Sequence, residues 1–245
     1  MQNKPANLTV GCECNWMFIN RQQAGILLAK QLTQLIAQDE QLDAHKMIVL
    51  ALPRGGVPVG LEIALTLNCP LNVITSKKIG APDQPELAIG AVTSNGVVIV
   101  DSQLKEFLRV PQSYIDKERE YLANKTKMLE HTWRQAAQLP EDLALQNKQV
   151  IVVDDGVATG MTAIAAACSL REQGAAKTIF ATPVISRRAC NLLQQEYNQV
   201  VALEIPEDFK AVGQFYIDFS QTSDAEVVSA LTLAKCRQNS DALTH

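Results

Sequence analysis

The sequence predicts an α/β fold in which a parallel β-sheet is covered by helices. Several short segments, such as MIVLAL (47–52) and QVIVV (149–153), are apolar at nearly every position. Such runs are typical of strands buried on both faces. Segments with apolar residues at helical spacing lie between them. Because the two kinds of segment alternate along the chain, they indicate a parallel sheet with helices packed on its faces.

The first part of the chain contains two predicted helices and two predicted strands. The segment 20–38 has apolar residues at helical spacing, and Asn20 is a suitable N-cap because its side chain can accept a hydrogen bond from the first turn. The apolar run 47–52 ends at PRGG, which predicts a buried strand followed by a tight loop. A helix at 57–67 and a strand at 71–75 follow.

The second part of the chain continues the alternation. The helix predicted at 162–174 ends at Gly174, a residue that favours the C-terminal position of a helix. The last helix is capped by Ser223 or Asp224. The remaining predicted elements are strands at 97–100, 149–153, 177–185 and 199–205 and a helix at 187–197.

Two segments interrupt this alternation. Residues 76–96 contain glycines, prolines and polar residues, which predicts a long loop; such loops are usually functional or disordered. Residues 113–138 are rich in charge and predict a solvated helix that packs on the sheet or on a partner. The sequence has no internal repeat and no low-complexity linker. We therefore expect one domain over residues 1–245.

The composition excludes several classes of protein. The chain has 245 residues, 47% of them hydrophobic and 20% charged, which is typical of a globular protein. The net charge of −4 argues against nucleic-acid binding. Neither a membrane-spanning run nor the apolar core of a signal peptide is present, so we expect a cytoplasmic protein. Cys12 and Cys14 form an isolated CxC, which favours reduced thiols over a zinc site.

The segment VIVVDDGVATGMTA (150–163) carries the strongest functional signal. A buried strand ends at the adjacent carboxylates Asp154 and Asp155, and a turn of small residues and threonines leads into a helix. Ligands bind at this end of parallel strands, and successive N–H groups at a helix N-terminus suit a phosphate. The two carboxylates would repel that phosphate unless they contact neutral hydroxyls or a cation. A sugar phosphate with a free diol meets both requirements; a helix cap beside a solvated acid is the alternative.

This segment resembles the phosphoribosyl-pyrophosphate (PRPP) motif of the type I phosphoribosyltransferases. LALPRGGVPVG (50–60) resembles the pyrophosphate loop of the same family, and residues 76–92 stand where that family has its flexible loop. The resemblance covers about residues 18–235 and extends to a subgroup of bacterial phosphoribosyltransferases without an assigned acceptor. It implies a parallel sheet flanked by helices, with a small hood and a flexible loop.

The resemblance also implies roles for individual residues. Asp154 and Asp155 would hold the ribose 2′- and 3′-hydroxyls. Arg54, with Gly55 and Gly56, would bind pyrophosphate, the glycines by letting amides approach the oxygens. Lys77 and Lys78 would neutralise the leaving group as the loop closes; the alternative is two solvated lysines. The 5′-phosphate would be wrapped by Gly156, Val157, Ala158, Thr159, Gly160, Met161 and Thr162.

The implied reaction forms an N-glycosidic bond while pyrophosphate leaves C1 of the ribose. Mg²⁺, bound mainly through PRPP, would be the cofactor, and it would stabilise the departing charge together with Arg54 and a lysine. The partners would be PRPP and a small acceptor. A homodimer is common in the family, and the oligomeric state stays open.

The acceptor also stays open, because two resemblances disagree. Hypoxanthine-guanine enzymes carry an acid where this chain has Ala158, whereas adenine enzymes share ATG and use a glutamate of the flexible loop, as Glu86 would here. The segment 204–219, however, resembles the purine-contacting segment of the hypoxanthine-guanine enzymes. Phe209 would then stack on a base, and Asp218 would lie near Mg²⁺; a core aromatic and a solvent-facing acid are the alternatives.

A regulatory function is the competing class. Some proteins with this fold sense PRPP or nucleotides without catalysis, and they tend to lose the flexible loop or alter the pyrophosphate loop. This chain keeps Arg54, Gly55, Gly56 and both lysines, and its net charge is negative. These features favour an enzyme, although fold alone does not decide function.

Overall fold

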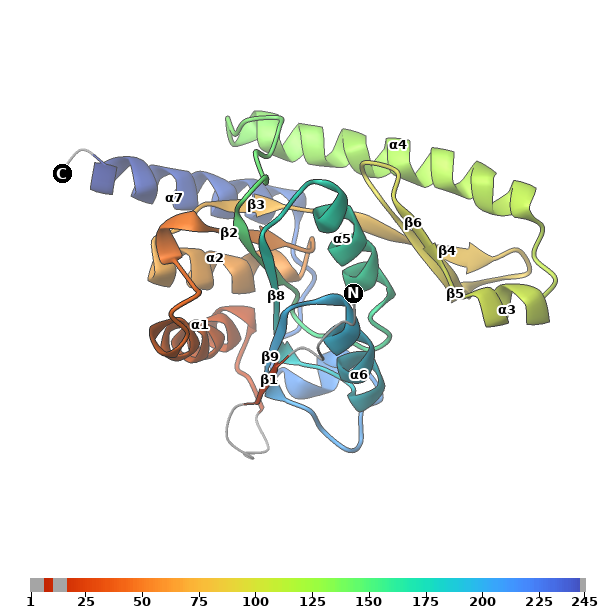
Figure 1. The fold of residues 1–245 in the computed structure, drawn as a ribbon, viewed down its shortest axis with the longest axis horizontal. Coiled ribbons are helices and arrows are strands. Elements are labelled where there is room, and N and C mark those ends of the chain that lie inside the picture. The colour runs from red at the N-terminus through yellow and green to blue at the C-terminus, as the bar shows by residue number, and fades with distance from the viewer. Residues whose placement is uncertain (1–6, 11–16, 243–245) are drawn as a thin grey trace.

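The structure is a computed structural model that describes residues 7–10 and 17–242. Its centre is a six-stranded sheet with the order β1-β9-β8-β7-β2-β3, and every neighbouring pair of strands is parallel. A second sheet has three antiparallel strands in the order β4-β5-β6. In Figure 1 this second sheet projects from the main body, with α4 running along the top of both parts.

The elements follow one another in an almost regular alternation. In chain order they are β1 (Asn7–Val10), α1 (Arg21–Gln38), η1 (Ala44–Lys46), β2 (Met47–Ala51), α2 (Gly56–Leu67), β3 (Leu71–Val73), β4 (Ser76–Ala81), β5 (Gln84–Thr93), β6 (Val98–Val100), α3 (Ser102–Phe107), α4 (Gln112–Ala136), β7 (Gln149–Val153), α5 (Met161–Glu172), β8 (Lys177–Val184), α6 (Arg187–Glu196), β9 (Gln199–Glu204), η2 (Val212–Phe215) and α7 (Asp224–Ala242).

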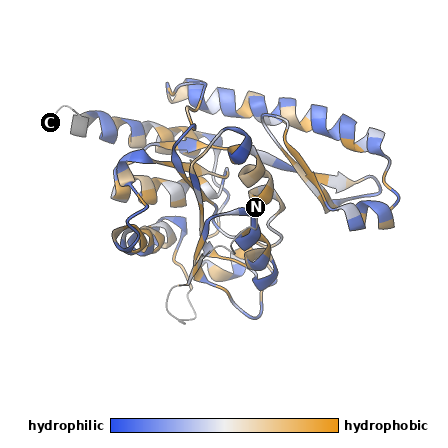
Figure 2. Ribbon diagram, in the orientation of Figure 1, coloured by the Kyte–Doolittle hydropathy of each residue, from blue (hydrophilic) through white to orange (hydrophobic). Residues whose placement is uncertain are grey.

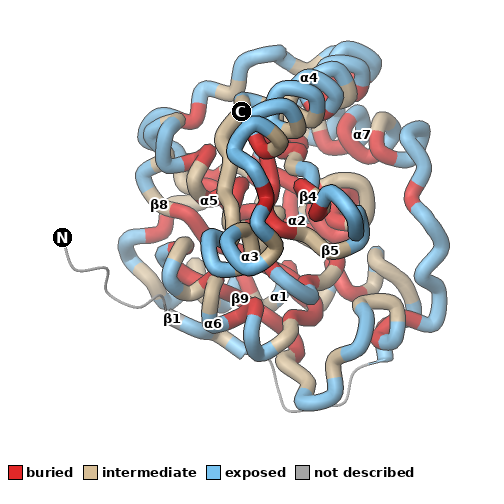
Figure 3. Tube along the Cα trace, turned by 90° about the vertical axis from the view of Figure 1, so that its right-hand side faces the viewer, coloured by how far each residue is buried: buried red, intermediate tan, exposed pale blue. Residues whose placement is uncertain are grey.

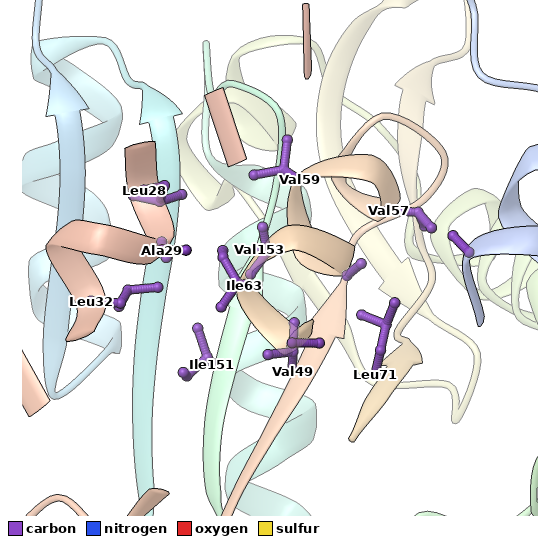
Figure 4. Packing of buried hydrophobic residues seen from close by; sticks show 14 of the residues in the cluster. Leu28, Ala29, Leu32, Val49, Val57, Val59, Ile63, Leu71, Ile151 and Val153 are labelled. Atoms are coloured by element: carbon purple, nitrogen blue, oxygen red, sulfur yellow. The ribbon is translucent and has the colours of Figure 1, made fainter. Parts of the chain in front are cut away.

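Helices cover both faces of the parallel sheet. One apolar cluster joins α1, α2 and α7 to one face, and a second joins α5 and α6 to the other. Figure 4 shows the first cluster, in which Leu28 and Leu32 of α1 and Ile63 of α2 pack over Val49 and Ile151 of the central strands. The uniformly apolar strands are therefore buried on both faces, as the sequence predicts.

Local signals set the ends of the helices. The side chain of Asn20 accepts a hydrogen bond from Gln23 N at 2.9 Å and caps α1 as predicted. Gly174 follows α5 with a φ of +76°, a left-handed conformation that glycine adopts without a steric cost. The hydroxyl of Ser223 accepts a hydrogen bond from Glu226 N, which selects Ser223 over Asp224 as the cap of α7.

Some elements were not predicted, and two predictions need correction. Strand β1, helix α3 and the short helices η1 and η2 lie outside every predicted element. The strand predicted at 97–100 exists as β6, but it pairs antiparallel with β5 instead of joining the parallel sheet. The long loop predicted at 76–96 is mainly the β4–β5 hairpin.

The second sheet, with α3 and the adjoining part of α4, forms an arm with a small core of its own. Ile79 and Ile89 of the hairpin pack with Val110 and Ile115, and all four are buried. The hydroxyl of Tyr114 on α4 donates to Gly80 O at 3.0 Å. Figure 3 looks at α3, β4 and β5 end-on and shows mixed exposed and buried segments. The hairpin thus acquires regular structure by packing on the rest of the arm.

Helix α4 has mostly hydrophilic colouring in Figure 2, and two of its hydrophobic residues, Tyr121 and Met128, are exposed. The helix spans the region predicted as a solvated helix, and it packs on the arm, on α7 and on the sheet. Among the described helices, none has an apolar stretch long enough to cross a membrane. Cys12 and Cys14 lie outside the described residues.

Candidate functional site

The two predicted motifs meet at the carboxyl edge of the parallel sheet. Strands β2 and β7 are neighbours, and the order of strands reverses here: β3 lies beyond β2, whereas β8 and β9 lie beyond β7. The loops that follow β2 and β7 therefore leave the sheet side by side, and Leu52 N donates to Val153 O at 2.8 Å. Crevices at such reversals are where open α/β sheets bind their ligands.

Glycine allows the two loops to approach closely. A Cβ added to Gly55 would lie 2.0 Å from Oδ2 of Asp155, and one added to Gly56 would lie 2.5 Å from Val153 O. Both distances are far below van der Waals contact. The glycines of PRGG are thus required by contact with the acid motif, independently of any ligand.

The acid pair is largely buried: Asp155 is 9% exposed, and Asp154 is partly buried. The N–H of Asp155 donates to Oδ1 of Asp154 at 2.9 Å, and the hydroxyl of Tyr216 donates to Asp155 O at 2.6 Å. Burial raises the pKa of Asp154 well above its ordinary value, the adjacent Asp155 carboxylate raises it further, and the Arg21 guanidinium partly opposes both effects. The two carboxylates therefore behave as an interacting pair.

Arg21 is the direct counter-ion of this pair. Its Nε donates to Oδ2 of Asp155 at 2.6 Å, and the two side chains are only 11% and 12% exposed. It is the first residue of α1, where the Asn20 cap fixes the direction of the chain. The sequence pattern places an arginine at a helix start, and nothing in it indicates a partner 134 positions away.

The turn after the acids leads into the N-terminus of α5. Gly160 precedes the helix with a φ of +81°, and the hydroxyl of Ser186 donates to Ala158 O at 2.6 Å. Ala158 and Thr159 are exposed. The first N–H groups of a helix have no partner within the helix, so the turn presents donors that suit an anion.

Beside the acid pair is a cavity of about 460 Å³ that contains several predicted site residues. It brings together Arg54, Gly55, Lys77 and Asp155 from three separate segments. Nη1 of Arg54 lies 3.6 Å from Oδ1 of Asp224. The cavity is lined by Arg21, Pro53, Arg54, Gly55, Thr75, Ser76, Lys77, Leu129, Trp133, Asp155, Gln221, Thr222 and Asp224.

Helix α4 holds the base of the hairpin at this cavity. Oε1 of buried Glu130 accepts hydrogen bonds from Thr75 N at 2.5 Å, from the Thr75 hydroxyl at 2.7 Å and from the Ser94 hydroxyl at 2.9 Å. Arg134 pairs with Oε2 of Glu130 at 3.0 Å and donates to Val73 O. Both ends of the hairpin that carries Lys77 are therefore fixed to one carboxylate.

Of the predicted site residues, only Arg54, Gly55, Lys77 and Asp155 line this cavity. Gly56, Asp154 and the turn 156–162 do not line it, and neither do Lys78, Glu86, Phe209 and Asp218. Lys78 and Glu86 are exposed on the hairpin, and Lys78 faces away from Lys77 because side chains alternate along a strand. Phe209 packs against Phe215, with ring centroids 5.5 Å apart. Asp218 is exposed, and its Oδ1 accepts a hydrogen bond from Ser220 N, which lowers its pKa.

The cavity also contains residues that the sequence did not indicate. Arg21, Thr75 and Asp224 belong to elements that lie far apart in the chain, so only the fold reveals their proximity. Trp133 is 1% exposed, and its Nε1 has no hydrogen-bond partner among the described residues. The helical spacing along α4 is a signal for the burial of Trp133, but the sequence gives no signal that Trp133 lies at the cavity.

A larger cavity of about 800 Å³ lies between α4, α5 and the segment 141–145 and contains no predicted site residue. The smaller cavity is the better candidate for the functional site, because there Asp155 of the acid pair lies together with Arg54 and Lys77. Within residues 7–10 and 17–242, no three His, Cys, Asp or Glu side chains gather as a metal site.

Comparison with known proteins identifies the family that this chain resembles. The family model described as "Phosphoribosyl transferase domain" matches residues 15–220. A protein of Mycobacterium tuberculosis (strain H37Rv), "Putative phosphoribosyl transferase Rv0571c", is 37% identical over 219 residues, which cover 89% of this chain and 47% of the relative. A protein from strain CDC 1551 with a corresponding name, MT0597, matches to the same extent. This chain thus spans about half the length of the curated relatives that it matches.

A solved structure is also similar. The protein TT1426 from Thermus thermophilus has 35% sequence identity and a TM-score of 0.73, and the match covers 88% of this chain and 98% of that one. The predicted fold class and the predicted family resemblance are both confirmed.

Proposed function

Because the chain belongs to the phosphoribosyl transferase family, we propose that it binds PRPP with Mg²⁺ and transfers the phosphoribosyl group to a nucleobase-like acceptor. The observation that carries the proposal is the contact between the two loops: Gly55 packs on Asp155 in one cavity that also holds Arg54 and Lys77. A diol-binding acid and pyrophosphate-binding cations are needed side by side, since PRPP carries both groups on adjacent atoms of one sugar.

In the proposed complex, each motif binds one part of PRPP. The carboxylates of Asp154 and Asp155 accept hydrogen bonds from the ribose hydroxyls, which are neutral and are not repelled. The N–H groups of the turn 156–162 bind the 5′-phosphate at the start of α5, with help from the hydroxyls of Thr159 and Thr162.

The basic side chains act on the leaving group. The C1–O bond to pyrophosphate breaks as the C1–N bond to the acceptor forms, and the proton of the acceptor nitrogen passes to water. Arg54 offers a planar fork of donors to the developing charge, and Lys77 adds a second cation from the hairpin. Bound Mg²⁺ would add Lewis-acid stabilisation of the pyrophosphate oxygens.

The remaining functional expectations are also proposals. Leu129, Trp133 and Thr222 give the cavity an apolar and hydrogen-bonding wall for an acceptor. The expected roles of Lys78 and Glu86 require the hairpin to move, and those of Phe209 and Asp218 require a rearrangement of the segment 205–219. A single domain, a cytoplasmic location and the choice between purine and other acceptors stay predictions.

The acid pair provides the direct test. We expect the double substitution Asp154→Asn with Asp155→Asn to weaken Mg²⁺-PRPP binding in calorimetry by at least about a hundredfold, because two charge-assisted hydrogen bonds are lost. Asp208→Asn, on an exposed acid outside the cavity, is the matched control. Unchanged affinity in the double variant would exclude the diol assignment.

A second measurement separates an enzyme from a sensor. We expect the wild-type protein to release pyrophosphate from Mg²⁺-PRPP when the correct base of a panel is supplied. Tight binding of Mg²⁺-PRPP without release for any purine, pyrimidine or pyridine base would instead favour the regulatory alternative.

A further inference from the structure

We propose that Arg21 is a positioning residue, which orients the Asp155 carboxylate towards the ribose hydroxyls and joins the acid pair to the segment 217–222. This inference rests on the proposed function, since it assumes that Asp155 contacts the diol. Arg21 lies outside both sequence motifs, and its importance follows only from its contacts in the folded chain.

Three contacts fix the guanidinium of Arg21. Nε donates to Oδ2 of Asp155 at 2.6 Å, and Nη1 donates to Ser220 O at 2.6 Å. The Cζ atom lies 4.1 Å from the centroid of the Phe219 ring, a cation–π arrangement. Contacts from two sides and a ring face leave little freedom of rotation, so the guanidinium is a rigid support for the carboxylate.

The closest contacts of the Asp155 carboxylate fall on Oδ2. Arg21 donates to Oδ2, and Gly55 packs closest to that same oxygen. The backbone of Asp155 is held separately, because its carbonyl accepts the Tyr216 hydroxyl and its N–H donates to Asp154. Oδ1 lies farther from Gly55 than Oδ2 does, so the proposal assigns to Oδ1 the hydrogen bond from a sugar hydroxyl.

The same guanidinium holds a wall of the cavity. Gln221 and Thr222 line the cavity and directly follow Ser220 and Phe219, which Arg21 contacts. The segment is also anchored to the residues before α1, since Asp218 N donates to Ile19 O at 2.9 Å. A lysine at position 21 could pair with Asp155. It lacks the planar guanidinium whose separate N–H groups donate to Asp155 and to Ser220 O at the same time.

The test compares two probes and three variants. Mg²⁺-PRPP contains the diol, whereas Mg²⁺-pyrophosphate does not. In calorimetry we expect Arg21→Gln to weaken Mg²⁺-PRPP binding at least tenfold while Mg²⁺-pyrophosphate affinity changes less than threefold. Arg21→Lys should lie between wild type and Arg21→Gln. Arg171→Gln is the matched control, because Arg171 is also ion-paired, with Glu196, and lies outside the cavity.

Each outcome of this test either supports or overturns the proposed role of Arg21. Equal losses for both probes would make Arg21 a general cation of the cavity, and wild-type affinity in folded Arg21→Gln would make the ion pair irrelevant; either result overturns the proposal. If Arg21→Gln does not fold, as judged by circular dichroism, Arg21→Lys decides by the same ratio between the probes. Failure of the wild-type protein to bind Mg²⁺-PRPP would instead overturn the proposed function itself.

Discussion

The edge of the parallel sheet and the hairpin arm contribute to the same cavity in different ways. At the sheet edge, Gly55 contacts Asp155 so closely that no side chain fits between them, and the acid pair follows the buried residues 150–153 of β7. In the arm, Lys77 reaches the cavity from an exposed strand position, and the hairpin has its own small core. One region is fixed by dense packing, whereas the other is attached through the hydrogen bonds of Glu130.

This difference indicates that the sheet edge serves to bind the ligand and that the arm serves to close over it. Groups that recognise the sugar must be held accurately, because small displacements are costly in a binding site. Groups that cover the leaving group can be carried by a less constrained element that moves during each cycle. Substitutions at the sheet edge should therefore have larger effects than substitutions in the arm.

The largest effect is expected for Gly55→Ala. The added Cβ would lie 2.0 Å from Oδ2 of Asp155, so the carboxylate or the loop must shift by about 1 Å or more. We expect Mg²⁺-PRPP affinity in calorimetry to fall by about a hundredfold or more. Gly60→Ala is the control, because Gly60 lies in α2, the helix that Gly55 precedes as N-cap, and its added Cβ would stay 3.2 Å from its nearest neighbour. An affinity unchanged by Gly55→Ala would contradict the close approach.

Arg54→Ala should have the next largest effect. The lost charged hydrogen bonds correspond to about tenfold to hundredfold in affinity for Mg²⁺-PRPP and for Mg²⁺-pyrophosphate. A nucleoside monophosphate lacks the group that Arg54 would bind, so its affinity should change by less than about threefold. Titration of the three ligands separates the roles: equal losses for all of them would mean that Arg54 supports the fold, for example through Asp224.

The two lysines of the hairpin offer an internal comparison. Lys77 lines the cavity and Lys78 does not, because neighbours on a strand point to opposite faces. Lys77→Ala should lower kcat/KM for pyrophosphate release by about tenfold, and Lys78→Ala should have little effect. The reverse order, or equal losses, would require the hairpin to rotate or refold when PRPP binds.

The sequence predicted the sheet edge well because its signals are local. A buried strand, two acids and a glycine turn are contiguous, and the residues around Asp154 and Asp155 take the predicted strand–turn–helix arrangement. PRGG follows a strand in the same way. The contact between Arg21 and Asp155 could not be predicted from the sequence, because it depends on how α1 packs across the sheet.

The arm was predicted less well because its structure depends on tertiary contacts. Glycines and prolines in 76–96 are typical of a loop, yet Ile79 and Ile89 find partners on Val110 and Ile115 and stabilise a hairpin. The short apolar run 97–100 predicts a strand of the parallel sheet, but in the structure it pairs antiparallel with β5. Apolar runs of this length predict a strand without specifying its partner.

The pH dependence of the acid pair should be a smaller effect. The pKa of Asp154 is raised above its ordinary value of 3.8, chiefly by burial and then by Asp155. The neutral form is thus favoured in the ligand-free fold: its stabilisation is complete below about pH 4 and is lost as the pH rises through the raised pKa. Binding of a diol needs the carboxylate, so it should strengthen over the same range.

Calorimetric unfolding with and without Mg²⁺-PRPP checks this sign. We expect the rise in melting temperature caused by Mg²⁺-PRPP to grow as the pH increases from about 4. Asp154→Asn cannot ionise, so its unfolding should show a weaker dependence on pH. A ligand-induced rise that shrinks with increasing pH would contradict the assignment.

The smallest expected effect concerns motion of the arm. Glu86 is exposed at the start of β5, beside the tip of the hairpin, whereas Ile79 and Ile89 are buried. Proteolysis after glutamate should therefore require local opening near the tip without unfolding of the arm core. If the hairpin closes over Mg²⁺-PRPP, saturating ligand should slow cleavage at Glu86 by about threefold.

Glu40 is the control, because it lies in an exposed turn before β2, at the opposite edge of the sheet. Equal protection of Glu40 and Glu86 would indicate general stabilisation by the ligand. If Glu86 is cut at an unchanged rate while calorimetry shows bound Mg²⁺-PRPP, the hairpin does not act as a lid, and Lys77 must meet the leaving group from the position it already occupies at the cavity.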